Sequence, residues 1–387
     1  WTLLDPELLH QQLNQQSSIR TELALLKRCG EGLTDVLQGR VDPLSLLFPK
    51  GDLTDLTNLY QNSAGPQVMN QLVQEAVIAA IGNRPDSRPV RILEIGAGTG
   101  GTTANLLPPL SELASTASVG TVSYLFTDIS PRFTSAAQER FQSYDFVDYA
   151  LLDIETSPQA QGFVNSFDIV IAANVLHATA DLQTTLTHVG QLLSPGGQLI
   201  LLEGTQPVGW IDLIFGLTPG WWKFADTAIR AKHPLISVDR WQTLLKSVGF
   251  ETALALQPKN PDNPALSQSV MIAQRPTVAI KHWGLLGTVA EASPIVACLK
   301  DNDQRFEAWS TVQQQNCDGV VHTLPGTSTE KGQKNMVAAT ESVCRQALET
   351  IQTLANQPKA PRLYFVALGA TSEAQLIHSG LWGLVQT

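Results

Sequence analysis

The stretch from Val90 to Gly101, VRILEIGAGTGG, constrains the fold of this chain more than any other stretch. Apolar residues dominate its first half, and glycine occupies four of its last six positions. This pattern predicts a buried strand that breaks into a tight turn, with a helix opening at about Thr102. Glycines permit positive φ angles and let a ligand approach the backbone closely. The backbone N–H groups at the start of the helix would then face that ligand.

An acidic residue precedes the glycines, because Glu94 stands near the carboxyl end of the predicted strand and gives the pattern E-x-G-x-G-x-G. Open α/β sheets bind ligands at that end of their strands. A carboxylate there suits a cationic group better than a pyrophosphate. The pattern resembles the first motif of class I methyltransferases, whose ligand S-adenosylmethionine carries an ammonium and a sulfonium. The cofactor-binding residues predicted from this stretch are Glu94, Gly96, Ala97, Gly98 and Gly100.

From Val90 onward the chain alternates between strands and helices, which predicts a right-handed, doubly wound sheet. Five strands are apolar on both faces, as parallel strands covered by helices must be, and two weaker strands follow. The predicted strands are 90–95, 122–127, 147–152, 167–172, 198–203, about 250–256 and 268–274. The resemblance to class I methyltransferases implies an α/β fold with a Rossmann-like, seven-stranded and mostly parallel sheet.

Further candidate ligand-binding residues follow the second, third and fourth predicted strands. Asp128, with Ile129 beside it, ends the second strand, and its carboxylate could accept both hydroxyls of a ribose. Leu152 and Asp153 end the third strand, where an apolar contact and a carboxylate could hold adenine and its amino group. Asn174 follows the fourth strand. All would line one crevice, although a carboxylate after a strand can equally be a helix cap.

His177 and Glu203 are the strongest candidates for catalysis. His177 follows the fourth strand in ANVLHAT, and Glu203 ends the fifth in LILLEGT, so neighbouring strands would bring both to one crevice. A carboxylate fixes the tautomer of an imidazole and stabilises its charged form, which makes such a pair a general base. The alternative is a histidine that is hydrogen-bonded within the core and a glutamate that caps a helix.

Residues 1 to about 275 resemble the C-methyltransferase domain of modular polyketide synthases. The segments that carry the resemblance are KRCGEGLTDVLQGRVDPLSLLFP, LYQNSAGPQ, ILEIGAGTGGTT, FTDIS, IAANVLHAT and LILLEGT. The resemblance implies that His177 and Glu203 act as a dyad and that Tyr60 lies at the active site. It also implies S-adenosylmethionine as cofactor and a β-ketoacyl thioester, tethered to an acyl carrier protein, as substrate. His177 would remove a proton from the α-carbon, which would then take the methyl group.

Three regions are predicted along the chain. Residues 1–65 form an N-terminal helical cap, and residues 66–275 form the methyltransferase core. Within the core, an aromatic insertion at about 204–235 is interpreted as a lid, the alternative being a packed surface loop. Residues 276–387 resemble part of the structural, non-catalytic half of a ketoreductase domain, on the segments RLYFVALGA and GLWGLVQT. The other domains of the same synthase polypeptide are therefore expected partners, and the absence of an initial Met suggests a piece of a longer protein.

Composition limits the other partners. The net charge of −10 argues against nucleic acid and anionic membranes, and no apolar run reaches the length of a membrane span. Four scattered cysteines are typical of reduced thiols in a cytoplasmic protein, and no ligand cluster suggests a metal. A local basic stretch, formed by Lys223, Arg230, Lys232 and His233, is a hypothetical docking site for the carrier protein, although a charge run is more often a solvated face.

Two other functions stay open at this stage. An O- or N-methyltransferase of a biosynthetic assembly line would share the first motif, although the dyad and the N-terminal segments favour carbon. A non-catalytic scaffold that retains the fold is the second alternative. The intact glycines, Asp128, His177 and Glu203 argue against such decay.

Overall fold

The computed structural model divides the chain into two compact units, residues 1–277 and 278–387. The structure describes residues 19–82, 89–114, 121–163, 166–258 and 267–276 of the first unit. In the second unit it describes residues 282–286, 305–309, 319–324, 334–355 and 362–367. The predicted helix before residue 19 and the segment GLWGLVQT lie outside the described residues. No helix in the described ranges is both long and apolar enough to cross a membrane.

The first unit is built on a seven-stranded sheet with the order β3-β2-β1-β4-β5-β7-β6. The first five strands are parallel, and β7 runs antiparallel to both β5 and β6. The strands are β1 (Val90–Ile95), β2 (Val122–Asp128), β3 (Val147–Leu151), β4 (Phe167–Ala173), β5 (Leu193–Gly204), β6 (Thr252–Leu256) and β7 (Gln268–Gln274). The predicted α/β fold with a mostly parallel sheet is confirmed.

β5 begins five residues earlier than predicted. Leu193 still pairs with Phe167 of β4, and the pairing register then shifts before Ile169. Residues 194–197, SPGG, predict a turn before this strand, and Gly196 has a φ of +77°, which a glycine adopts at little cost. The Ser-Pro-Gly-Gly turn is therefore an irregularity inside the strand rather than a loop before it.

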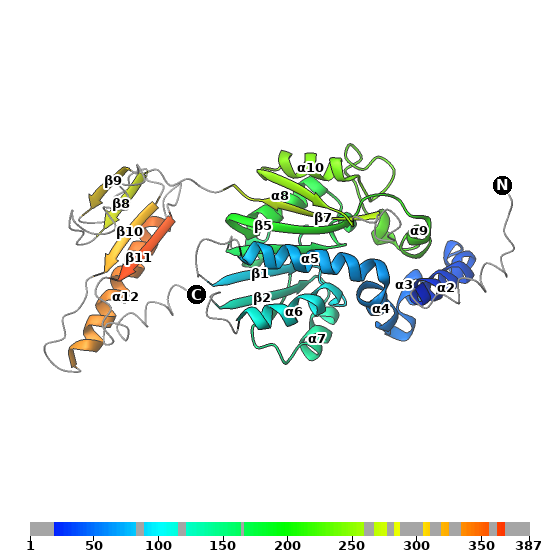
Figure 1. Cartoon of the computed structure of the whole chain (residues 1–387), viewed down its shortest axis with the longest axis horizontal. Coiled ribbons are helices and arrows are strands. Elements are labelled where there is room, and N and C mark those ends of the chain that lie inside the picture. Colours follow the sequence, from blue (N-terminus) through cyan, green and yellow to red (C-terminus); the bar gives the residue numbers. More distant parts are fainter. Residues whose placement is uncertain are drawn as a thin grey trace. The chain divides into compact units, whose positions relative to one another are not determined.

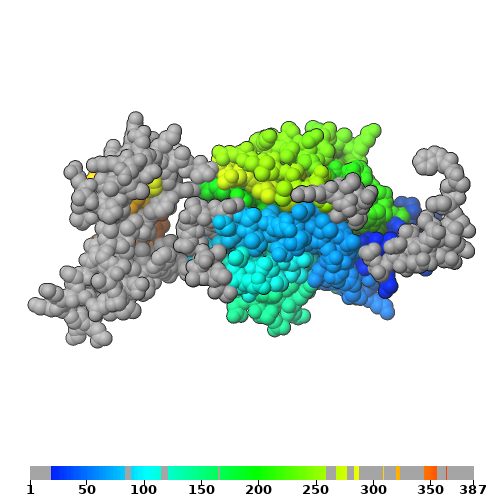
Figure 2. Space-filling model, viewed as in Figure 1, coloured from blue at the N-terminus to red at the C-terminus, as the bar shows by residue number. Residues whose placement is uncertain are grey.

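Helices cover both faces of this sheet (Figure 1). One face is covered by α5 (Ala64–Gly82), α6 (Gly101–Ala114) and α7 (Pro131–Arg140). The other is covered by α8 (Leu182–Leu192) and α10 (Val238–Ser247). The resulting apolar layers on the two sides explain why the central strands are apolar on both faces. Figure 2 shows the outer surface of α5, in blue, running across one side of the unit.

A smaller apolar cluster joins the N-terminal helices to the segment after β5. Its helices are α2 (Arg20–Leu37), α3 (Pro43–Leu47), α4 (Thr54–Asn62) and α9 (Gly209–Phe215). Leu25 and Leu59 pack there with Ile214 of α9. The first described helices therefore pack against the insertion that was predicted as a lid.

The segment NLYQNSAGPQ, residues 58–67, predicts a loop that leads into a helix at about 67–81, and the prediction of a loop is wrong. α4 continues to Asn62, and α5 starts at Ala64, so only Ser63 separates the two helices. Ser63 is extended, and its carbonyl accepts a hydrogen bond from Gln67 N at 2.9 Å. Pro66 lies in the first turn of α5, where its missing N–H leaves no partner unsatisfied.

The second unit contains a four-stranded parallel sheet with the order β11-β10-β8-β9. Its elements are β8 (His282–Leu286), β9 (Arg305–Trp309), β10 (Gly319–Leu324), α12 (Lys334–Ala355) and β11 (Arg362–Ala367). Leu354 of α12 packs with Leu286 and Val320 of the sheet. The sequence predicts a helix from the apolar stripe of Met336, Val343, Ala347, Ile351 and Leu354, and a strand at 362–368; both are confirmed by α12 and β11. A strand is also predicted at 317–324, and its first two residues lie outside the described ranges.

Candidate active site

The glycine-rich loop after β1 has the backbone conformation that its sequence predicts. Gly96, Gly98 and Gly100 all have positive φ, at +56°, +55° and +73°. A Cβ on Gly96 would lie 2.3 Å from Val175 Cγ2, so the turn admits no side chain there. A Cβ on Gly98 would meet only the Gly96 carbonyl oxygen, at 3.8 Å, and would otherwise project into open space. The loop therefore leaves its backbone accessible to a ligand.

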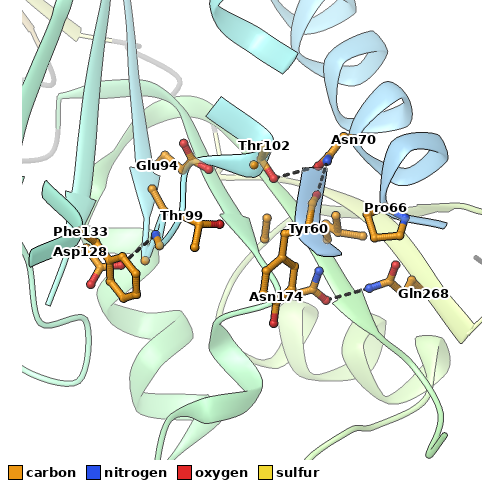
Figure 3. A pocket seen from close by; sticks show the side chains of 16 residues that line it. Tyr60, Pro66, Asn70, Glu94, Thr99, Thr102, Asp128, Phe133, Asn174 and Gln268 are labelled. Atoms are coloured by element: carbon orange, nitrogen blue, oxygen red, sulfur yellow. Dashed lines mark hydrogen bonds between the residues drawn. The ribbon is translucent and has the colours of Figure 1, made fainter. Parts of the chain in front are cut away.

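That open space is a cavity of about 230 Å³, called the glycine-loop cavity below. It is lined by Tyr60, Pro66, Asn70, Glu94, Gly96, Ala97, Gly98, Thr99, Gly101, Thr102, Asp128, Phe133, Ala173, Asn174, Leu202 and Gln268. Figure 3 shows that Asp128 and Phe133 lie at one end, and that Tyr60, Pro66 and Gln268 lie at the other. The cavity therefore extends from the end of β2 across the end of β1 to the junction of α4 and α5.

Glu94 supplies a buried carboxyl to this cavity. The hydroxyls of Thr103 and Tyr124 both donate hydrogen bonds to its Oε2, whereas its Oε1 accepts none from the described residues. Burial raises the pKa of the Glu94 carboxyl to about 7, against the effect of these two hydrogen bonds, and nearby Asp128 adds to the rise. A cationic ligand in the cavity would favour the charged form of Glu94.

We expect Glu94 to make stability depend on pH in the ligand-free protein. Because its pKa is higher folded than unfolded, folding is favoured while Glu94 is protonated. The free energy of unfolding should therefore fall as the pH rises from about 4.5 to about 7. In Glu94→Gln, whose amide oxygen can still accept both hydroxyls, this fall should shrink by about 3 kcal/mol. Urea unfolding of wild type and variant at pH 5 and pH 8 measures this change in the free energy of unfolding.

The control for this experiment is Glu31→Gln, which changes an exposed carboxylate on α2. The Glu31 variant should keep the wild-type fall in stability between the two pH values. If the free energy of unfolding of Glu94→Gln falls as much between pH 5 and pH 8 as that of the wild type, then Glu94 is not the cause of this pH dependence.

Asp128 holds the opposite end of the cavity in place. Its Oδ2 accepts from Gly98 N at 2.9 Å, and its Oδ1 accepts from Ser130 N at 2.8 Å. Burial raises the pKa of the Asp128 carboxyl, and these backbone hydrogen bonds oppose the rise. The side chain thus ties the glycine loop to the end of β2 and faces the cavity with its remaining lone pairs.

Four of the residues predicted to bind cofactor do not line this cavity. A Cβ on Gly100 would lie 2.8 Å from the ring of Phe141, so Gly100 serves the packing of the loop. Leu152 is buried in the core. Ile129 is 63% exposed, and the Asp153 carboxylate accepts from Glu155 N at 3.0 Å, as a turn cap does. Their predicted contacts with a ligand stay predictions.

His177 and Glu203 form a hydrogen-bonded pair. His177 lies in a short 3₁₀ turn after β4, Leu176–Ala178, and its Nδ1 is 2.7 Å from Glu203 Oε2. The other oxygen of Glu203 accepts three backbone N–H groups of this turn, from residues 175 to 177, at 2.8–3.3 Å. Because a carboxylate only accepts, the hydrogen stays on Nδ1 and the lone pair of Nε2 is free.

The His177 ring lines a second, larger cavity of about 520 Å³, called the acceptor cavity below. Tyr60, Pro66, Asn174 and Gln268 line this cavity and the glycine-loop cavity alike, so the two adjoin. Asn174 has a φ of +53°, rare for a residue other than glycine, and its Oδ1 accepts from Gln268 Nε2 at 3.0 Å. Such strained backbone persists where its surroundings hold it, most often at functional sites.

Arg230 fixes the turn that carries His177. The guanidinium is 1% exposed and donates to the carbonyl oxygens of His177 and Thr179, each at 2.8 Å. Its Nε donates to Asp226 Oδ1 at 2.6 Å, and Asp226 Oδ2 accepts from Leu182 N at 2.9 Å. A buried ion pair thus locks the histidine turn to the segment after α9.

The hypothesis of a basic docking stretch is wrong for Arg230, because that side chain is buried and fully engaged. Lys223 pairs with Glu155, and His233 Nε2 lies 2.9 Å from Asp212 Oδ1. Lys232 alone of the four makes no ion pair with a described residue. The position of these basic residues along the sequence could not show that the chain folds back and buries the side chain of Arg230.

Several lining residues have no signal in the sequence. Gln268 reaches the site because β7 pairs antiparallel with β5, which places it opposite Gly204. Asn70 lies in the middle of α5, where its amide donates to Tyr60 O and accepts from the Thr102 hydroxyl. Trp221, whose ring centroid lies 5.1 Å from that of His177, comes from the predicted lid. Gln268 and Asn70 can be assigned to the site only from the folded structure, whereas Trp221 lies in the aromatic insertion that the sequence predicts as a lid.

The residues present fit a ligand of defined chemistry. The open space beside Gly98 allows a ligand group to contact the backbone closely, and the free Oε1 of Glu94 can bind a cationic group. Asp128 can accept hydroxyls at the far end. An electrophilic group bound in the middle of the glycine-loop cavity, between Glu94 and Asp128, would lie close to the acceptor cavity, because the two cavities share a wall.

The comparison with protein families and curated proteins points to methyl transfer. A methyltransferase domain model matches residues 93–199. The non-reducing polyketide synthase mapC of Penicillium roqueforti (strain FM164) is 39% identical over 254 residues, which are 64% of this chain and 10% of that protein. The chain thus spans about a tenth of the length of the curated relatives it matches.

Solved structures match over about seven tenths of the chain. The CurJ carbon methyltransferase is 46% identical with a TM-score of 0.65, covering 71% of this chain and 72% of that one. The citrinin polyketide synthase CMeT domain is 33% identical with a TM-score of 0.64, covering 72% and 71%. The trans-methyltransferase CalH in complex with SAH is 33% identical with a TM-score of 0.56, covering 70% and 71%. The sheet of the first unit is that of a class I methyltransferase that uses S-adenosylmethionine, and the chain belongs to the carbon methyltransferase family found in polyketide synthases.

Proposed function

We propose that this chain methylates the α-carbon of a β-ketoacyl thioester carried by an acyl carrier protein. The observation that carries the proposal is the His177–Glu203 pair, because its imidazole lines a cavity that adjoins the glycine-loop cavity. The similarity to carbon methyltransferases supports carbon as the acceptor atom. An α-carbon between two carbonyls is acidic enough for a histidine to deprotonate, because the resulting enolate is delocalised.

The glycine-loop cavity would hold S-adenosylmethionine through the residues described above. Glu94 would lie near its ammonium group, and Asp128 would accept its ribose hydroxyls. When bound, S-adenosylmethionine supplies an electrophilic methyl group on a sulfonium. The shared wall of Tyr60, Pro66, Asn174 and Gln268 would then be the place where methyl and acceptor carbon meet. Bringing them to about 3–3.5 Å in line is the main contribution of the protein.

His177 would act as the general base through Nε2. The α-proton moves to Nε2, and the electron pair of the broken C–H bond enters the enolate. Glu203, bonded to Nδ1–H, stabilises the imidazolium that forms. The enolate α-carbon would then be the nucleophile for the methyl group that S-adenosylmethionine supplies when bound. The ring is held for this step by Trp221, which meets it edge to face, and by the Arg230 contacts.

Tyr60 would stabilise the enolate. Burial, and after it the nearby Glu203 charge, raise the pKa of the Tyr60 phenol, so the hydroxyl keeps its proton. The hydroxyl makes no hydrogen bond to a described residue, whereas the ring packs against Phe215 at a centroid distance of 6.2 Å. A hydroxyl with a free proton, on the shared wall, suits a developing oxyanion.

Two neighbouring regions have proposed roles in the same enzyme. Residues 204–235 would close over the acceptor as a lid, since Trp210, Phe215 and Trp221 of this segment line the acceptor cavity. Residues 276–387 would belong to the structural half of a ketoreductase domain. A parallel sheet with a packed helix, α12, is compatible with that assignment.

Product analysis tests the proposed function. The chain is incubated with ¹³C-methyl-labelled S-adenosylmethionine and a 3-oxoacyl thioester on a carrier protein. The expected product carries the label on carbon 2, seen by NMR as a methyl coupled to a C–H. A methoxy signal would overturn carbon methylation in favour of an O-methyltransferase. Failure of calorimetric titration to detect binding of S-adenosylmethionine would favour a non-catalytic scaffold.

A further inference from the structure

We propose that the acyl chain of the substrate has an apolar, reduced tail beyond its β-keto group, rather than a series of further ketones. This inference rests on the proposed function and specifies its substrate class. It comes from the part of the acceptor cavity that lies away from the shared wall, called the tail region below. The described apolar side chains of the tail region are Ile19, Leu23, Leu26, Leu59, Trp210, Ile211, Phe215, Trp221 and Leu235.

The tail region is formed where the N-terminal helices meet the insertion after β5. Leu26 of α2 and Phe215 of α9 both pack on the small apolar cluster that contains Leu59. The reacting groups His177 and Tyr60 line the same cavity, with Tyr60 on the shared wall, and the rings of Trp221 and Phe215 pack against them. A thioester whose α-carbon reaches this wall would extend its acyl chain toward the apolar lining.

Hydrogen-bond donors in this lining are scarce. The Thr218 hydroxyl donates to Phe215 O at 2.7 Å, and the indole N–H of Trp221 donates to Asp212 Oδ1 at 3.2 Å. Both donors are therefore committed within the protein. Among the described side chains of the tail region, the indole of Trp210 and the hydroxyl of Ser267 are the donors that remain.

Glu22 adds an acceptor to the same lining. Its Oε2 is buried and has no hydrogen-bond partner. A ketone oxygen is also only an acceptor, so a carboxylate beside it offers no hydrogen bond and repels it. A methylene at the same place gains from leaving water and loses no hydrogen bond. A chain ketone would lose its hydrogen bonds to water without replacement.

The phosphopantetheine arm is a poor occupant of the tail region for the same reason. It carries two amides and a hydroxyl. Glu22 could accept from one of their N–H or O–H groups, but the two amide carbonyl oxygens would find few donors among these side chains. An alkyl chain suits the lining instead, since aromatic and aliphatic side chains surround it. The arm would then enter by another side of the cavity.

The test compares two substrates of equal length, the pantetheine thioesters of 3-oxooctanoic acid and 3,7-dioxooctanoic acid. They share the reacting carbons and differ only in a methylene or a ketone at carbon 7. We expect kcat/KM for carbon methylation to be at least about tenfold higher for the 3-oxooctanoyl thioester than for the 3,7-dioxooctanoyl thioester. Equal values, or a preference for the diketone, would overturn the inference. Absence of carbon methylation with both, while S-adenosylmethionine binds, would overturn the proposed function itself.

A variant then assigns the selectivity to the tail region. Leu26→Gln places an amide N–H donor in the lining, so the preference for the alkyl tail should fall by about threefold or more. Leu37→Gln, on the same helix but 75% exposed and outside the cavity, is the matched control and should keep the wild-type ratio. If Leu26→Gln does not unfold cooperatively, Phe215→Tyr supplies a hydroxyl donor in its place. An unchanged ratio in the folded variant would overturn the inference.

Discussion

Replacing His177 with alanine is expected to lower the rate of carbon methylation by about 10²–10⁴-fold, the usual contribution of a general base. Among the residues of the shared wall, Tyr60, Pro66, Asn174 and Gln268, no other base is placed to take the α-proton, and the carboxylate of Glu22 lies in the tail region of the acceptor cavity. Tyr60 keeps its own proton, because burial raises the pKa of its phenol. Glu203 has one oxygen engaged by three backbone N–H groups. Single-turnover methylation of a carrier-bound 3-oxoacyl thioester, followed by product mass, measures the loss.

The affinity for S-adenosylmethionine should not change in His177→Ala. His177 lines the acceptor cavity but not the glycine-loop cavity, so calorimetric titration should give the wild-type dissociation constant. His188→Gln is the matched control, because His188 lies outside both cavities and its ring bonds Ile154 O at 2.7 Å. Wild-type methylation in the His177 variant would remove the dyad from the mechanism.

The parts of the fold that local sequence patterns specify were predicted well. The strands β1, β2 and β4 are largely buried apolar runs, and such a run is visible without any knowledge of its neighbours. The prediction of two apolar faces is wrong for β3, which lies at the edge of the sheet and is partly exposed. Ser237 caps α10 through a hydrogen bond from Arg240 N, and Gly249 follows the helix with a φ of +98°. A serine before an apolar helical stripe predicts an N-cap, and a glycine after it predicts the end of the helix, so residue type and position are sufficient at both ends.

The prediction failed or was silent where distant segments decide the outcome. Asn, Ser, Gly and Pro in residues 58–67 favour a loop, yet tertiary packing of Leu59 stabilises the first half of this segment as part of α4. Arg230 looks like a surface charge in the sequence, and only the return of the chain beneath the His177 turn buries it. Gln268 joins the site through pairing of β7 with β5.

The His177–Glu203 pair could be predicted only in part from the sequence. His177 and Glu203 could be predicted to share a crevice, because parallel neighbouring strands end at the same edge of the sheet. Their bond at 2.7 Å depends on details that no spacing reveals. Among these is the irregular pairing at the start of β5, which sets the register of β5 against β4. The three backbone N–H groups that hold Glu203 in place are equally invisible in the sequence.

Glu203→Gln should reduce carbon methylation by about 10²–10⁴-fold while leaving the fold nearly intact. The amide oxygen of the glutamine can keep the three hydrogen bonds from residues 175 to 177. Its NH₂ group would replace Oε2 and donate to Nδ1 of His177. The ring hydrogen would then have to sit on Nε2, so the nitrogen that faces the substrate could no longer accept a proton. Rates are measured as for His177→Ala, and urea unfolding checks the fold.

A double variant separates this account from a general loss of structure. If Glu203 acts only through the tautomer and charge of His177, then Glu203→Gln should cost nothing further once His177 is alanine. The double variant should therefore methylate at the rate of His177→Ala alone. Glu203→Ala, by contrast, leaves three backbone N–H groups without their acceptor and should also lower the free energy of unfolding by several kcal/mol. Multiplication of the two rate losses in the double variant would show that the residues act independently, and the base mechanism would fail.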